Sequence, residues 1–204
     1  MTRVGAPALA HVPVLLLLAA CGHSSPASST PKPSRCPTTP VRVHAQEELD
    51  ALRGCTTLPG LELRGAVPFD LTPLESLTAI GGDLTFRGTF ALGGVRLPAL
   101  ARVGGAVTIV SNLELGGVYL PRLASARSLT ITDAPPLLEI MLPALAEIPG
   151  DLTFARLPQL ELVDLSALPA VGGAFVVEKA PRIATWLGPT ETARPTPASA
   201  ESQD

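Results

Sequence analysis

The fold is decided by a thirteen-residue stretch that is clearest at residues 97–109, Leu-Pro-Ala-Leu-Ala-Arg-Val-Gly-Gly-Ala-Val-Thr-Ile. Variants that keep its apolar positions occupy residues 74–86, 120–131, 142–154 and 165–177. Their first leucines lie 23, 23, 22 and 23 residues apart. A fixed period in this range is typical of a solenoid, in which each repeat forms one turn that cannot stand alone and must stack on its neighbours.

Each repeat contains two short segments that alternate apolar and polar residues, as strands with one buried face do. The first segments are residues 61–63, 84–86, 107–109, 129–131, 152–154 and 175–177, and the second are 95–97, 118–120, 140–142 and 163–165. Gly-Gly or Pro-Gly pairs recur at 81–82, 104–105, 149–150 and 172–173. We expect a tight corner there, formed by a positive φ or a preset turn, and no helix within the repeats. Trp186, the single tryptophan, is expected to close the last turn.

The amino terminus has the pattern of an export signal. Arg3 precedes an apolar run at residues 12–20 that is too short to cross a bilayer as a helix. The run ends Leu-Ala-Ala-Cys-Gly at residues 18–22, which resembles the bacterial lipobox. The resemblance implies cleavage before Cys21, diacylglycerol on its thiol, and a further acyl chain such as palmitate on the new amino group. Two or three acyl chains hold a protein stably on a membrane. The alternative is ordinary secretion, with Cys21 discarded in the leader.

These features predict four regions. Residues 1–20 are expected to be a lipoprotein signal peptide, 21–40 a Ser/Pro/Thr-rich tether attached to lipid, 41–187 the solenoid, and 188–204 a disordered polar tail. Gly22 favours the outer membrane, by analogy with enterobacterial sorting rules. We therefore expect a protein of the bacterial cell envelope that is held to the membrane through lipid on Cys21.

The other two cysteines, Cys36 and Cys55, bracket a segment in which residues 47–52 look like a short amphipathic helix. In an oxidising compartment they are expected to form a disulfide that closes an amino-terminal cap, which a solenoid needs at its exposed end. A zinc site is the alternative, but His44 is the single histidine after the leader, and three ligands fall short of a closed tetrahedral site.

The repeat Leu-Pro-x-Leu-x-x-Val-Gly-Gly-x-Leu-x-Ile, preceded by a cap that ends Gly54-Cys55, resembles the receptor L-domain, a relative of leucine-rich repeats. The resemblance covers roughly residues 36–183. It implies an all-β fold, a right-handed parallel β-helix of about six turns, and a role in binding. The asparagine ladder of regular leucine-rich repeats is missing, because its column contains Thr89, Asn112, Ala134, Leu157 and Ala180.

The sequence points to no enzyme. One histidine after the leader leaves no nucleophile and base to pair. Asp83 and Asp151 share a column but lie three turns apart, about 14 Å, which is too far for a glycosidase pair, so we expect both to be solvated turn residues. The Gly-Gly pairs lack the following lysine of a phosphate-binding loop. We expect no cofactor, no metal site and, with a net charge of −3 and no basic face, no nucleic-acid partner.

The middle residues of the second strands are expected to point outward and form a candidate contact face: Arg96, Tyr119, Met141 and Asp164. An exposed tyrosine beside a methionine could bind a partner, although an ordinary surface explains the same residues. The leading hypothesis is a non-enzymatic, lipid-anchored envelope protein whose solenoid binds a protein or glycan. The alternative is a structural role in envelope organisation without a discrete ligand. The sequence leaves ligand identity and oligomeric state open.

Overall fold

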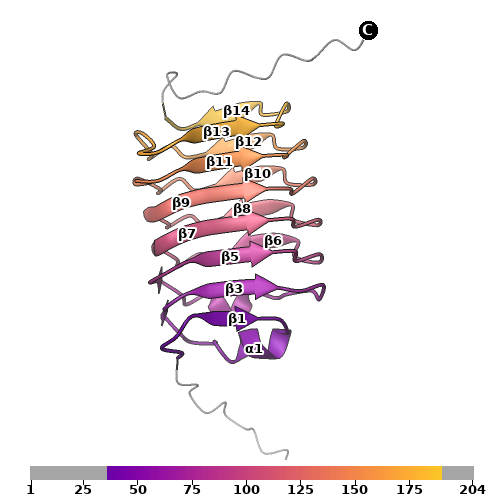
Figure 1. The fold of residues 1–204 in the computed structure, drawn as a ribbon, viewed down its shortest axis with the longest axis vertical. Coiled ribbons are helices and arrows are strands. Elements are labelled where there is room, and N and C mark those ends of the chain that lie inside the picture. Colours follow the sequence, from indigo (N-terminus) through magenta and orange to yellow (C-terminus); the bar gives the residue numbers. More distant parts are fainter. Residues whose placement is uncertain (1–35, 190–204) are drawn as a thin grey trace, which may run out of the picture. The chain divides into compact units, whose positions relative to one another are not determined.

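Parallel strands stack one above another into two facing sheets (Figure 1), in a computed structural model that describes residues 36–189. The first sheet runs β1 (Val41–Val43), β3 (Leu61–Arg64), β5 (Leu84–Arg87), β7 (Arg102–Val110), β9 (Ser125–Thr132), β11 (Leu152–Ala155) and β13 (Phe175–Glu178). The second runs β6 (Gly94–Arg96), β8 (Gly117–Tyr119), β10 (Glu139–Met141), β12 (Leu162–Asp164) and β14 (Thr185–Leu187). The strands of the first sheet run from left to right as the chain rises, which makes the coil right-handed. The predicted all-β parallel solenoid of about six turns is confirmed.

The register between neighbouring strands is the one that the sequence repeat predicts. Leu84 pairs with Val107, which pairs with Leu129, and Leu152 pairs with Phe175. In the second sheet Val95 pairs with Val118, in line with the second predicted segments. Strand β14, which contains Trp186, extends that sheet by one rung beyond the predicted segments.

A third, shorter run of pairs flanks the first sheet. Strands β2 (Thr57–Leu58) and β4 (Ala79–Ile80) pair with each other, and β4 pairs with the first residues of β7. Strands β7 and β9 extend across this corner into the first sheet, with a register shift between Val103 and Ala106. The sequence analysis did not predict these pairs, because two residues are too few to show a period.

The Gly-Gly pairs serve a different purpose from the one we expected. No glycine of these pairs has a positive φ among the described residues. They are needed because the backbones of neighbouring turns approach closely here. A Cβ on Gly82 would lie 2.7 Å from the carbonyl oxygen of Pro59, and one on Gly172 would lie 2.5 Å from that of Pro149. Of the two alternatives expected at these corners, a positive φ or a preset turn, the positive φ is therefore wrong.

The left-handed corner lies instead directly after five of the seven strands of the first sheet. One residue with a φ between 52° and 60° follows β5, β7, β9, β11 and β13: Gly88, Ser111, Asp133, Arg156 and Lys179. Four of the five are not glycine, and each such residue costs roughly 1–2 kcal/mol. The stack holds them in place, since the backbone N–H of Ser111 donates to the carbonyl of Thr132 on the next turn.

Aliphatic side chains fill the space between the sheets in columns. Leu63, Phe86, Ile109, Ile131 and Phe154 form one such column, and none is exposed. Asn112 is the one asparagine in the column where regular leucine-rich repeats have a ladder, and it is buried. The Asn112 carboxamide accepts hydrogen bonds from the backbone N–H (3.0 Å) and the hydroxyl (2.5 Å) of Thr89, and donates to the carbonyl of Phe86.

The amino-terminal cap contains the expected disulfide. Cys36 and Cys55 are bonded, with their Cα atoms 5.6 Å apart. The helix α1 (Gln46–Asp50) begins one residue before the predicted helix and ends two residues earlier, and it buries Leu49. Strand β1 was not predicted, although it pairs with β3 and starts the first sheet. The signal peptide, Cys21, residues 22–35 of the tether and residues 190–204 of the tail lie outside the described residues.

Candidate functional site

The four residues of the predicted contact face lie on successive rungs of the second sheet. Arg96 pairs with Tyr119, Tyr119 with Met141, and Met141 with Asp164. Arg96 is exposed and the other three are half-buried. The prediction that these four residues lie in one column is therefore correct. Their contacts with other side chains were not predicted.

Tyr119 is fixed by residues of the rungs on either side. The guanidinium carbon of Arg96 lies 4.0 Å from the centre of the tyrosine ring, a cation–π contact. The Tyr119 hydroxyl donates a hydrogen bond to a carboxylate oxygen of Glu139. This bond, with burial and the nearby negative charge, raises the pKa of Tyr119. The ring is therefore contacted from both neighbouring rungs.

A glycine beneath the ring makes this conformation possible. Gly117 lies two residues before Tyr119, on the same side of the strand, and a Cβ there would be 2.5 Å from the ring carbon Cε2 of Tyr119. The Tyr119 ring lies over the space that a side chain at position 117 would occupy. The contact-face prediction did not include Gly117, although the position of the Tyr119 ring depends on it.

A cleft of about 410 Å³ adjoins Tyr119 on the side of the amino-terminal cap. Its polar lining residues are Asp70, Thr72, Glu75, Arg96 and Tyr119, and we call it the Tyr119 cleft. The 3₁₀ helix η1 (Thr72–Leu74) supplies part of one wall.

Hydrogen bonds to Asp70 order the wall of the cleft near η1. The Asp70 carboxylate accepts hydrogen bonds from the Thr72 hydroxyl (2.5 Å) and backbone N–H (3.0 Å), and these bonds lower the pKa of Asp70. The Gln46 side chain of α1 donates to the carbonyl of Asp70 and accepts from its N–H. The cap therefore fixes one side of the cleft and the solenoid fixes the other.

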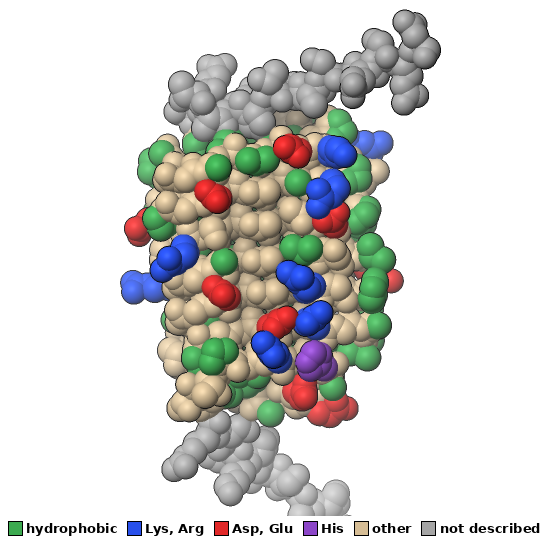
Figure 2. All heavy atoms as spheres, in the orientation of Figure 1, with side chains coloured by type: hydrophobic (Ala, Val, Ile, Leu, Met, Phe, Trp, Pro, Cys, Tyr) green, Lys and Arg blue, Asp and Glu red, His purple; other side chains and the backbone are tan. Residues whose placement is uncertain are grey.

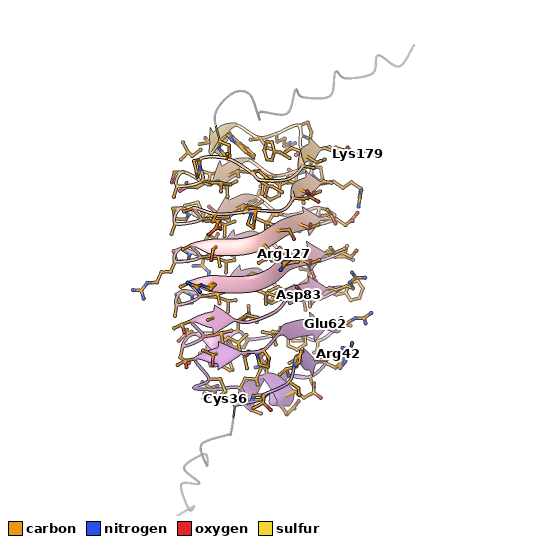
Figure 3. All side chains as sticks on the ribbon, turned by 60° about the vertical axis from the view of Figure 1, so that its left-hand side comes forward. Cys36, Arg42, Glu62, Asp83, Arg127 and Lys179 are labelled. Carbon is orange, nitrogen blue, oxygen red and sulfur yellow. A yellow bond between two sulfur atoms is a disulfide. The ribbon has the colours of Figure 1, made fainter. Side chains whose placement is uncertain are left out.

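A second hollow, of about 680 Å³, lies over the corner where β7 and β9 enter the first sheet. Arg102, Ser125, Arg127 and Glu147 contribute its polar side chains, and we call it the arginine groove. Figure 3 shows Arg127 on the same face as Asp83, on a different rung. Among residues 36–189 neither arginine forms an ion pair.

The sequence analysis missed the arginine groove, although the sequence contains its signal. The turn from Leu120 to Leu142 is the one with 22 residues, and it lacks the Gly-Gly or Pro-Gly pair found in its neighbours. Arg127 stands alone at that position, and the backbone N–H of Gly150 on the next turn donates to its carbonyl. A break in an otherwise constant period therefore marks a place where the surface is hollowed.

Asp83 and Asp151 are exposed turn residues, as expected, and each also makes a hydrogen bond to the next turn. The Asp83 carboxylate accepts a hydrogen bond of 2.8 Å from the backbone N–H of Ala106, on the next turn. Asp151 makes the same bond, also 2.8 Å, to Ala174. Each aspartate thus ties its own turn to the one above, beside a glycine pair.

Ionisable side chains are dispersed over the part of the chain that the structure describes. No group of three or more His, Cys, Asp or Glu side chains gathers there as a metal site would. Charged side chains of both signs are scattered over the first sheet (Figure 2), with no continuous basic face in this view. Within residues 36–189 we also find no helix with the length and apolar character needed to span a bilayer.

Comparison with known proteins adds no relative. No protein-family model, no curated protein and no solved structure matches this chain.

Proposed function

We propose that this chain is a non-enzymatic, lipid-anchored protein of the bacterial cell envelope, most consistent with the outer membrane, whose solenoid binds a protein or a glycan. The leader and its resemblance to the lipobox support the anchoring. The Cys36–Cys55 disulfide supports export, because disulfides persist in oxidising compartments. The resemblance of the repeats to the receptor L-domain supports binding.

The observation that carries the binding proposal is the fixed ring of Tyr119 beside a cleft. An aromatic side chain that is already ordered loses little conformational entropy when a partner packs on it, so more of the contact energy goes into affinity. Tyrosine and arginine are also the residue types that dominate binding energy at interfaces. The Tyr119 cleft offers both, next to the carboxylates of Asp70 and Glu75.

Crosslinking in cells followed by mass spectrometry should identify the partner, and substitution should then locate the site. We expect Tyr119→Ala to weaken binding of the recovered partner roughly thirtyfold, and Met141→Ala to weaken it less, as for a central residue and its neighbour. Tyr119→Phe keeps the ring and removes the bond to Glu139, so a smaller loss is expected. Binding is measured by titration of the purified chain with the partner.

The matched control is Thr130→Ala, which changes an outward side chain on the first sheet, away from the Tyr119 cleft. Its affinity should equal that of the parent. Unchanged affinity in Tyr119→Ala would remove this face from the proposal. An envelope defect on deletion of the gene, with no effect of any cleft substitution, would favour the structural role.

The anchoring proposal makes a separate prediction at Cys21. Cys21→Ser removes the thiol that the lipid would occupy, so the chain should become soluble or remain uncleaved, while the parent enters the detergent phase. Phase partitioning of cell extracts and intact mass measurement report this directly. A Cys21→Ser chain that is cleaved and still needs detergent for release would contradict the proposal.

A further inference from the structure

The two ends of the solenoid are closed to different degrees. At the amino-terminal end, α1 and the Cys36–Cys55 disulfide lie against the first turn, and Leu49 and Leu52 are buried there. At the other end, both sheets stop at a strand that has a neighbour on one side: β13 in the first sheet and β14 in the second. An open strand edge is a template for further pairing.

The core columns also stop at this end without a cover among the described residues. Phe175 and Val177 pair with Leu152 and Phe154, which are completely buried, yet both are half-exposed themselves. Two further columns also change from completely buried to half-exposed at the last turn. Leu160 and Val163 are completely buried, whereas Ile183 and Trp186, one turn later, are half-exposed. We call these four last-turn side chains, with the outer edges of β13 and β14, the end face: Phe175, Val177, Ile183 and Trp186.

The hydrogen bonds show which backbone groups are available on the end face. The carbonyls of Ala174 and Glu178 accept from Leu152 and Arg156 on the turn below. Because hydrogen bonding alternates along a strand in a parallel ladder, the N–H and C=O groups of Phe175 and Val177 point away from β11, toward the open edge. The indole N–H of Trp186 is also buried, and it finds no acceptor among residues 36–189.

The residues that follow in the sequence are poorly suited to cover this face. Residues 190–204 contain no Leu, Ile, Val, Phe, Met, Tyr or Trp, and they include Pro195 and Pro197. Such a segment cannot supply the large apolar side chains that each lower turn supplies to the one beneath it. Proline also lacks the N–H that a further strand would donate.

We propose that the end face binds the end face of a second copy of this chain, forming a two-fold symmetric dimer. A two-fold axis across the end places β13 antiparallel to β13 of the second copy, so that the free N–H and C=O groups of Phe175 and Val177 pair across the interface. The four apolar side chains are then covered from above, as they are at every lower turn. Because the opposite end is closed by the cap, such pairing stops at two copies and does not continue into a fibre.

The charges on the last turn are compatible with self-association. Glu178 is exposed near Lys179 and Arg182, so the rim of the end face contains both signs. Arg182 already bonds to Gln159 of the turn below at 2.5 Å. Two copies related by a two-fold axis therefore do not bring together rims of a single charge.

Sedimentation equilibrium of the full chain in a density-matched mild detergent tests the proposal. The average mass of the parent should rise from one chain toward two as concentration increases. Val177→Lys puts a charge into the end face and should raise the dissociation constant roughly thirtyfold, as expected for a central contact. Val176→Lys is the matched control, since Val176 pairs with Thr153 on the outward side of the same strand, and it should dimerise like the parent.

Hydrogen exchange of the unmodified protein keeps the proposal testable even if Val177→Lys disturbs the last turn. Exchange across residues 174–188 should slow at high concentration, while exchange across residues 41–64 should not change. Deletion of residues 190–204 should leave the dimer intact. A parent that stays monomeric throughout would overturn the proposal. If the deletion then produced a dimer, residues 190–204 would be the cover of the end face instead.

Discussion

Phe154→Ala is expected to lower the free energy of unfolding by about 3–5 kcal/mol, the usual cost of removing a buried phenylalanine ring. The ring is completely buried between the rungs of Ile131 and Val177. It also meets the indole of Trp186 edge-on, with ring centres 6.3 Å apart. Because hydrogen bonds on both sides hold the rungs at a fixed spacing, the surrounding backbone cannot move in to fill the space that alanine leaves.

Urea unfolding measures the effect with two signals. Trp186, the single tryptophan, reports on the last turns through fluorescence, and far-ultraviolet circular dichroism reports on all strands. Thr153→Ala is the control, because Thr153 precedes Phe154 and points outward, and we expect a change within about 0.5 kcal/mol. A loss below about 1 kcal/mol in Phe154→Ala would show that the rungs can collapse, contrary to the close packing described above.

The sequence predicted the strands of the solenoid well because the information for them repeats. Leu84, Val107 and Leu129 stand 23 and 22 residues apart. An alternating segment that is a weak strand signal by itself is supported by the same segment one period later. The register followed from this alignment, since the period of the repeat is the length of one turn. Elements that do not repeat were missed for the same reason, as β1 in the cap shows.

Interactions between turns were much harder to predict. For the glycine pairs we expected a positive φ or a preset turn, whereas the positive φ belongs to residues after the strands, such as Ser111 and Asp133. This error and the missed bond of Asp83 arise because the decisive neighbour lies about 23 residues away in the sequence. Asp83 reaches the N–H of Ala106 only once the turns are stacked, so its local sequence resembles that of any exposed aspartate.

In the candidate site, too, the features that follow from the repeat could be predicted and the contacts between turns could not. The column that contains Tyr119 could be predicted, because it follows from the repeat. Its fixed ring could not, because it depends on Arg96, Gly117 and Glu139, which come from three different rungs. In a solenoid, a surface of this kind is thus assembled from side chains of several turns, which the sequence of one turn does not show.

Gly104→Ala should be the most damaging change of an exposed residue in the solenoid, with a loss of about 2–3 kcal/mol. Gly104 is exposed to solvent, and exposed positions usually tolerate substitution within about 0.5 kcal/mol. Its Cβ, however, would overlap the carbonyl oxygen of Gly81 on the turn below. That oxygen belongs to the backbone and cannot rotate away, so two turns must separate to make room.

Gly93→Ala separates this effect from the general cost or benefit of replacing glycine. Gly93 is also exposed and also has no positive φ, and an added Cβ would meet nothing within 4 Å. Its stability should match or slightly exceed that of the parent, since alanine restricts the unfolded chain more than glycine does. Urea unfolding of both variants gives the comparison. Equal stabilities would mean that the turns are not in close contact at the glycine pairs, whereas a loss confined to Gly104→Ala would show that the spacing between turns, rather than backbone freedom, requires glycine there.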